Sequence, residues 1–127
     1  MNLTFNEEIF KNCRNKEQYF QYIEELVWLG REVQDNGIMA FESEKWQNVT
    51  AYEREAIDLL CEGGPPNRLE FMLTNLLNTS DFTEDEYIKA VLFRVFVIFL
   101  QPGGISETEM KKLLLSHFGI QEYHNRI

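Results

Sequence analysis

AVLFRVFVIFL, Ala90–Leu100, is the stretch that says most about how this chain folds. It is apolar at every position except Arg94, so a helix built from it has almost no face suited to water. Its eleven residues fall well short of the roughly 20 that a helix needs to cross a bilayer. We therefore expect a buried helix near residues 84–100, with the other helices of the chain packed around it.

The residues on either side of this run carry signals for the start and the end of a helix. Thr83 and Glu86 have the spacing of a capping box, in which each side chain bonds the backbone amide of the other residue. Phe82 and Tyr87 are spaced as a hydrophobic staple across the same start. After the run, QPGG at Gln101–Gly104 contains the residues that stop a helix.

Similar signals recur along the rest of the chain. Capping pairs of Ser, Thr or Asn with Glu or Gln three residues later occur at Asn15 and Gln18, Thr50 and Glu53, and Ser106 and Glu109. Gly63 can end one helix, Pro66 can open the next, and Gly119 can close the last. No stretch alternates apolar and polar residues for long, as a half-buried strand does. The sequence predicts an all-α fold, a compact bundle of five or six helices with one long N-terminal helix.

The N-terminal helix contains an ambiguous pair, Asn36 and Gly37, which usually marks a turn. The helical spacing of apolar residues up to Val33 continues beyond this pair and brings Gly37 onto the apolar face. A glycine inside a helix costs roughly 1 kcal/mol relative to alanine, and close packing of a neighbouring helix can offset that cost. We expect one helix over about Lys16–Glu44 with Gly37 at a helix contact. The alternative is a break at Asn36 and Gly37.

Size and charge limit the class of partner. At 127 residues the chain has the length of a single domain, residues 1–127, with room for a hydrophobic core. A formal net charge of −9 argues against nucleic acid, because phosphate binding needs a basic surface. The same charge disfavours the anionic inner face of a membrane. What remains is a protein partner, with a basic one as an option, or no specific partner.

The first twelve residues, MNLTFNEEIFKN, lack the basic start, apolar block and cleavage site of a secretion signal. We therefore expect a cytoplasmic protein, either a monomer or a small homo-oligomer. Cys13 and Cys61 have no CxxC spacing, which favours two reduced thiols in that compartment. Cys61 falls in an apolar helix and is expected to lie in the core.

The side chains of an active site do not assemble in this sequence. The only histidines, His117 and His124, lie near the C-terminus, and the Glu-x-x-His pairs of a di-iron bundle are missing. CEGGPPN, residues 61–67, lacks the Lys and Ser/Thr of a phosphate loop. The 21 acidic residues do not have the spacing of a calcium loop. We expect no catalytic, metal or cofactor site, and no enzymatic activity.

Two segments resemble the bacterial flagellar stator subunit of the MotA type. NGIMAFESE, residues 36–44, is similar to a helix of that family that carries a Gly, apolar residues and a Leu-Glu pair. LLCEGGPPNRLEFMLTNLL, residues 59–77, is similar to the next helix, its Gly-x-Asp-Pro turn and the third helix, with Gly63 and Pro66 in step. The resemblance covers about Leu26–Leu77. It implies the cytoplasmic helical segment of the stator, which contacts the rotor through charged residues.

The resemblance transfers to individual residues with two departures. The glutamate that lies two turns beyond the key arginine of the family falls on Glu42, but the arginine itself falls on Gln34. Arg31, one turn earlier, is the nearest basic substitute. The aspartate of the turn falls on Pro65. A contact with the rotor is therefore implied only in part.

On one continuous helix these positions share a stripe with exposed neighbours. The residues predicted to bind a protein partner are Trp28, Arg31, Gln34, Asp35 and Glu42, and Ile38 lies on the same stripe. The alternative is a solvated helix face with an Arg31–Asp35 ion pair worth a few tenths of a kcal/mol. Trp28 has its own alternative as a half-buried core residue.

The stator family has membrane-spanning helices on both sides of the matching segment, and this sequence has none. Ion conduction is therefore excluded. We expect residues 26–77 to keep the stator-like helical segment and residues 83–118 to form added helices. The expected function is a non-enzymatic module that docks to a flagellar motor component or another cytoplasmic protein. The alternative is a generic helical adaptor or regulator that is unrelated to motility.

Overall fold

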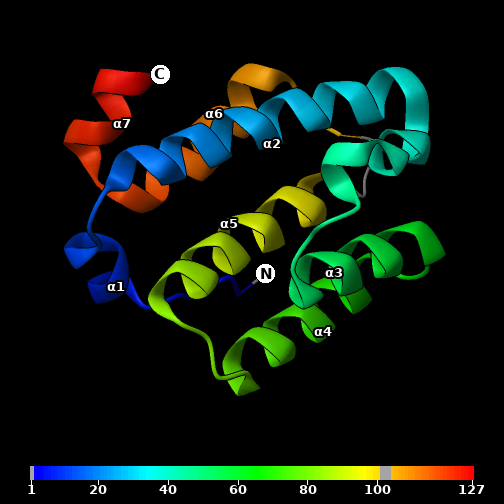
Figure 1. Cartoon of the computed structure of the whole chain (residues 1–127), viewed down its shortest axis with the longest axis horizontal. Coiled ribbons are helices and arrows are strands. Elements are labelled where there is room, and N and C mark those ends of the chain that lie inside the picture. Colours follow the sequence, from blue (N-terminus) through cyan, green and yellow to red (C-terminus); the bar gives the residue numbers. More distant parts are fainter. Residues whose placement is uncertain (1, 101–103) are drawn as a thin grey trace.

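The computed structural model describes residues 2–100 and 104–127. Within them the chain forms seven α-helices, three short 3-10 helices and no strand (Figure 1). The α-helices are α1 (Glu7–Asn12), α2 (Lys16–Asn36), α3 (Ala51–Glu62), α4 (Pro66–Thr79), α5 (Glu84–Leu100), α6 (Glu107–Leu115) and α7 (Ile120–Arg126). The 3-10 helices are η1 (Gly37–Glu42), η2 (Glu44–Trp46) and η3 (Ser116–Phe118). The all-α prediction is confirmed, but seven α-helices replace the predicted five or six.

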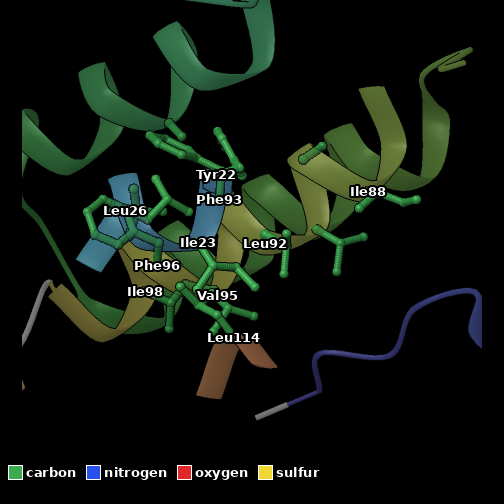
Figure 2. Packing of buried hydrophobic residues seen from close by; sticks show 14 of the residues in the cluster. Tyr22, Ile23, Leu26, Ile88, Leu92, Phe93, Val95, Phe96, Ile98 and Leu114 are labelled. Carbon is green, nitrogen blue, oxygen red and sulfur yellow. The ribbon is translucent and has the colours of Figure 1, made fainter. Parts of the chain in front are cut away.

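The predicted buried helix is confirmed as α5, which lies between the α2–α6 side and the α3–α4 side of the molecule (Figure 1). Every residue from Ala90 to Ile98 is buried. Figure 2 shows how α2, α5 and α6 meet, with Ile23, Phe96 and Leu114 contributed by the three helices. A helix that is apolar on all sides requires neighbours on all sides, and five other helices supply them.

Three of the four predicted N-caps form. The backbone amides of Glu53, Glu86 and Glu109 donate to the hydroxyls of Thr50 (3.1 Å), Thr83 (3.2 Å) and Ser106 (3.1 Å). The fourth prediction is wrong, because the side chain of Asn15 makes no capping bond at the start of α2. Asn15 instead has a left-handed backbone, with φ 53°. Most of the predicted stop signal, residues 101–103, lies outside the described residues.

The predicted continuous helix over Lys16–Glu44 is wrong, because α2 ends at Asn36. Gly37 has φ 68° and ψ −158°, a conformation that is accessible almost only to glycine. A Cβ at Gly37 would meet nothing within 4 Å, so this residue is not a helix contact. The chain continues as η1, which packs against α2. A 3-10 helix has three residues per turn, which is close to the value of about 3.6 for an α-helix. The spacing of apolar residues therefore looked the same on both sides of Gly37 and did not reveal the break.

The close approach of α2 to another helix occurs earlier, at Gly30. This glycine is buried, and a Cβ on it would lie 3.4 Å from the ring of Phe96 on α5. The sequence therefore places a glycine at a contact between α2 and α5, but the contact is two turns before the predicted one.

The structure also places the two cysteines and tests for a membrane-spanning helix. Cys13 is buried, whereas Cys61 is exposed and the prediction that it lies in the core is wrong. On α3 the buried positions are set by Ala56 and Leu59, and Cys61 falls on the other side of the helix. Among the described residues, no helix combines the length and the apolar composition needed to cross a membrane.

Candidate protein-docking face

The predicted docking residues lie at the C-terminal end of α2 and in η1. Trp28, Arg31, Gln34 and Asp35 belong to α2, and Glu42 is the last residue of η1. All five residues are exposed, Gln34 included. Because α2 ends at Asn36, Glu42 does not share one helical stripe with the other four. The two elements nevertheless pack together at one corner of the molecule, at the far end of α2 from α1 (Figure 1). Trp28 lies about two turns before this end of α2.

Large apolar side chains are exposed at this corner. The exposed fractions are 49% for Trp28, 55% for Ile38 and 67% for Met39. The tip of η1 presents Ile38 and Met39 to solvent, while Phe41 of the same helix is buried. Exposed apolar side chains that gather in one place are typical of protein interfaces. We call the set Trp28, Arg31, Asp35, Ile38, Met39 and Glu42 the docking corner.

Arg31 forms the only ion pairs of the docking corner among the described residues. Its guanidinium lies 3.9 Å from the carboxylate of Asp35 and 3.5 Å from that of Glu107 at the start of α6. The pair with Asp35, which was expected under the alternative of a solvated helix face, is therefore present. All three side chains are at least half exposed, and exposed pairs of this kind contribute about 0–1 kcal/mol to folding.

Gln34 has an internal role. Its side-chain amide donates to the backbone oxygen of Ile105 at 2.6 Å. It also lies beside Gly104, where an added Cβ would come within 2.6 Å of the amide nitrogen. Gln34 thus joins α2 to the segment that precedes α6. We therefore leave it out of the docking corner, although it stands where the stator family has its arginine.

The corner carries an excess of negative charge. Residues 28–45 contain the four carboxylates of Glu32, Asp35, Glu42 and Glu44 and two basic residues, Arg31 and Lys45. The last turn of α2 has no basic residue, although a helix favours cations at its C-terminal end. No described cation pairs with Glu42 or Glu44. The partial negative charge at this end of α2 is therefore not compensated by a basic residue in its last turn.

Met39 and Glu107 are the residues of this region that sequence reasoning missed. Met39 follows Ile38 directly, and two adjacent apolar residues after an Asn-Gly pair are a signal for an exposed turn once the helix is taken to break there. Glu107 had no such signal, because its contact with Arg31 joins residues 76 positions apart and depends on how α6 packs against α2.

A pocket of about 550 Å³ beside α4 includes Arg68, Glu70 and Phe71. Its two charged groups already have partners, since Arg68 donates to the Gly63 oxygen and Glu70 accepts from the Asn2 amide. No three His, Cys, Asp or Glu residues lie close enough to hold a metal ion in the part of the chain that the structure describes.

Two buried or reactive groups have structural explanations. The hydroxyl of Tyr22 donates to the buried carboxylate of Glu53 at 2.6 Å, and the other carboxylate oxygen accepts from the Thr50 amide as part of a helix cap. Burial, together with that carboxylate, raises the pKa of Tyr22. Burial, with Asp58 nearby, also raises the pKa of Cys61, so its thiol stays protonated at neutral pH and is a poor nucleophile.

The docking corner thus combines exposed apolar side chains with acidic residues that are close in sequence. Comparison of the chain with protein-family models, with curated proteins and with solved structures gives no match.

Proposed function

We propose that this chain is a non-enzymatic module that docks to a basic surface of another protein through the docking corner. The observation that carries the proposal is the exposure of Ile38 and Met39 in η1, which ends at Glu42, together with the exposure of Trp28 on α2. Neither Glu42 nor Glu44 has an ion pair with a described cation. Tryptophan and methionine are enriched at the centres of protein interfaces, where they anchor the partner. Carboxylates around such anchors attract a basic partner and select against an acidic one.

The partner chemistry follows from the end of α2. Free backbone carbonyls at a helix C-terminus carry partial negative charge, and the carboxylates of Glu32 and Asp35 add to it. A lysine or arginine from a partner would interact favourably with both. Apolar residues beside that cation would cover Ile38 and Met39. We therefore expect the partner to present a basic segment that also has apolar side chains.

The resemblance to the stator subunit suggests a partner of this kind in the flagellar motor, and that identity rests on the sequence alone. A generic adaptor role unrelated to motility is the second candidate. It is favoured by the end of α2 at Asn36, because Arg31 and Glu42 then lie on different elements rather than on one helix as the family pattern requires.

Photo-crosslinking in the native cell tests the location of the interface. A photoreactive residue in place of Met39 should give a defined adduct, and the same residue in place of Ile120 should not. The two positions are matched, because each is 67% exposed. Mass spectrometry of the adduct then identifies the partner and its basic segment. Equal labelling from both positions, or none from Met39, would contradict the proposal.

Charge reversal tests the partner chemistry. Glu42→Lys with Glu44→Lys should leave the melting temperature within a few degrees, since exposed charges contribute little to folding. The same double variant should reduce capture of the crosslinked partner at least tenfold. The control is Glu55→Lys with Asp81→Lys, which makes an equal change in net charge at exposed positions elsewhere. If the control weakens capture as much, the effect is one of net charge and not of the corner.

A further inference from the structure

The N-terminal arm, residues 2–14, is held by the rest of the molecule as a bound peptide would be. Residues 2–6 have no helical structure, and side chains of α4 and α5 bond their backbone. The amide of Asn2 donates to the carboxylate of Glu70 at 2.7 Å, and the amide of Asn6 donates to the hydroxyl of Tyr87 at 2.8 Å. The contacts are to main-chain groups, which any copy of the arm presents in the same way.

Arg94 of α5 is the central contact for this arm. One guanidinium nitrogen donates to the backbone oxygens of Leu3 (3.2 Å) and Thr4 (2.9 Å), and the other terminal nitrogen donates to Thr74 (3.3 Å). The side chain is completely buried, its Nε atom has no partner, and no carboxylate pairs with it among the described residues. A buried guanidinium is costly unless it is compensated. Without the arm, Arg94 would lose most of its hydrogen-bond acceptors.

An aromatic cluster also holds the arm against the body of the protein. Phe10, which is 1% exposed, lies 5.2 Å from the ring of Phe118 and 5.5 Å from that of His117. Phe5 lies 4.8 Å from the ring of His117. Burial lowers the pKa of His117, so at neutral pH it is an uncharged ring that bonds the Leu114 oxygen. Opening the arm would therefore expose apolar surface on the arm and on the body of the protein.

The connection between the arm and α2 is strained. Asn15 is the one non-glycine residue with a positive φ in the described ranges, and its side chain does not cap α2. Short strained hinges promote the exchange of a terminal element between copies of a protein, because the exchanged form relaxes the hinge and keeps every other contact.

We propose that the N-terminal arm exchanges between two copies of this chain, and that the groove formed by Glu70, Tyr87 and Arg94 binds the arm of the second copy. A second copy is the fitting occupant because it alone restores the three backbone contacts and the Phe10 cluster together. α1 of the arm and η1 of the docking corner lie at opposite ends of α2 (Figure 1), so the exchanged dimer presents two docking corners to partners.

The test uses a proline next to the hinge. Lys16 is the first residue of α2, where proline is tolerated, but proline drives the preceding residue out of the left-handed region. Lys16→Pro should therefore prevent the closed arm and give a dimer by light scattering after size-exclusion chromatography. The control is Lys16→Ala, which removes the same bond to the Lys11 oxygen and leaves Asn15 free to keep its conformation. It should stay monomeric like the wild type, and a monomeric Lys16→Pro protein overturns the proposal.

A second change shows whether a dimer uses the groove. Arg94→Met removes the donors to Leu3 and Thr4 while keeping an apolar side chain in the core. Lys16→Pro with Arg94→Met should have less than a tenth of the dimer seen with Lys16→Pro alone. A dimer of equal strength would show association through another surface and would overturn the proposal.

If the Lys16→Pro variant does not fold, as judged by the loss of its helical circular dichroism, arm exchange is tested with the wild-type chain. At about 1 mM, which is comparable with the effective concentration of a tethered arm, the wild type should form a measurable dimer fraction in sedimentation equilibrium. Asn15→Gly removes the strain at the hinge and should lower that fraction. A wild type that is entirely monomeric at this concentration, or a fraction that does not fall in Asn15→Gly, overturns the proposal.

Discussion

α2 and α3 end with the same backbone geometry, but the side chains beyond the two ends differ. Gly37 has φ 68° and ψ −158°, and Gly63 has φ 75° and ψ −148°. After Gly63, Arg68 of α4 donates to the glycine oxygen at 3.1 Å and lies 3.4 Å from the carboxylate of Glu62. After Gly37 the chain supplies the carboxylates of Glu42 and Glu44, and the described cation at the end of α2 is Arg31 of the same helix, 3.9 Å from the carboxylate of Asp35.

The comparison shows that a helix end has two separate requirements: a change of chain direction, and compensation of its partial negative charge. Glycine permits the change of chain direction in both places, and it does so without help from neighbours. Compensation of the partial negative charge depends on a side chain from elsewhere, and Arg68 provides it for α3. The end of α3 is thus an internal joint between two helices. The end of α2 has no such joint among the described residues, and the proposed docking role assigns this place to a partner.

The shared geometry gives the largest expected effect. Gly37→Ala and Gly63→Ala should each lower the free energy of unfolding by about 1–3 kcal/mol, because alanine is strained at these backbone angles. Urea unfolding measures both. Had Gly37 been inside a continuous helix, alanine would have stabilised the chain instead. A gain of stability at Gly37 would therefore break the comparison and restore the long helix.

The second-largest expected change in the free energy of unfolding comes from Arg68, the cation at the end of α3. Arg68→Met should lower the free energy of unfolding by about 0.5–1.5 kcal/mol, because it removes a hydrogen bond to the Gly63 oxygen and an ion pair with Glu62. Arg31→Met removes two exposed ion pairs and should cost less than about 0.5 kcal/mol. Thermal unfolding of the two variants side by side checks the order. Equal losses would mean that Arg31 also supports the fold.

The smallest effect comes from giving α2 the cation that α3 already has. Asn36→Lys places a lysine in the last turn of α2, four residues after Glu32, and should raise the free energy of unfolding by about 0.3–1 kcal/mol at low salt. The gain should shrink in about 0.5 M salt, where screening is strong. Asn36→Gln is the neutral control. The lysine should also weaken docking, because it competes with the partner's own cation for the same place.

Local signals made most of the fold predictable. The buried helix α5 was evident from the apolar run Ala90–Leu100, and the caps at Thr50, Thr83 and Ser106 were evident because each involves residues three apart. The helices α1 and α7 were missed, because six and seven residues are too few to show a helical period.

The parts that resisted prediction depend on contacts without a local pattern. The end of α2 was misplaced because Ala40 and Phe41 of η1 kept a spacing that resembles an α-helix. The exposure of Ile38 and Met39 follows from that break, so the docking corner was predicted only in part. Arg94 was noted as a charge within an apolar run, but its acceptors are backbone oxygens 90 and 91 positions away. Every residue has a backbone oxygen, so the residue types at positions 3 and 4 could not indicate a contact with Arg94.

The long separation between the arm and Arg94 has a consequence during synthesis. The arm leaves the ribosome before its binding groove, which is incomplete until about 90 further residues have been added. At about 5–20 residues per second this takes about 5–18 s, a period in which the backbone oxygens of Leu3 and Thr4 have no Arg94 to bind. Neighbouring ribosomes on one message hold other chains of the same protein at high local density. The interval before closure is therefore the time at which a nascent chain is most exposed to pairing with its own kind.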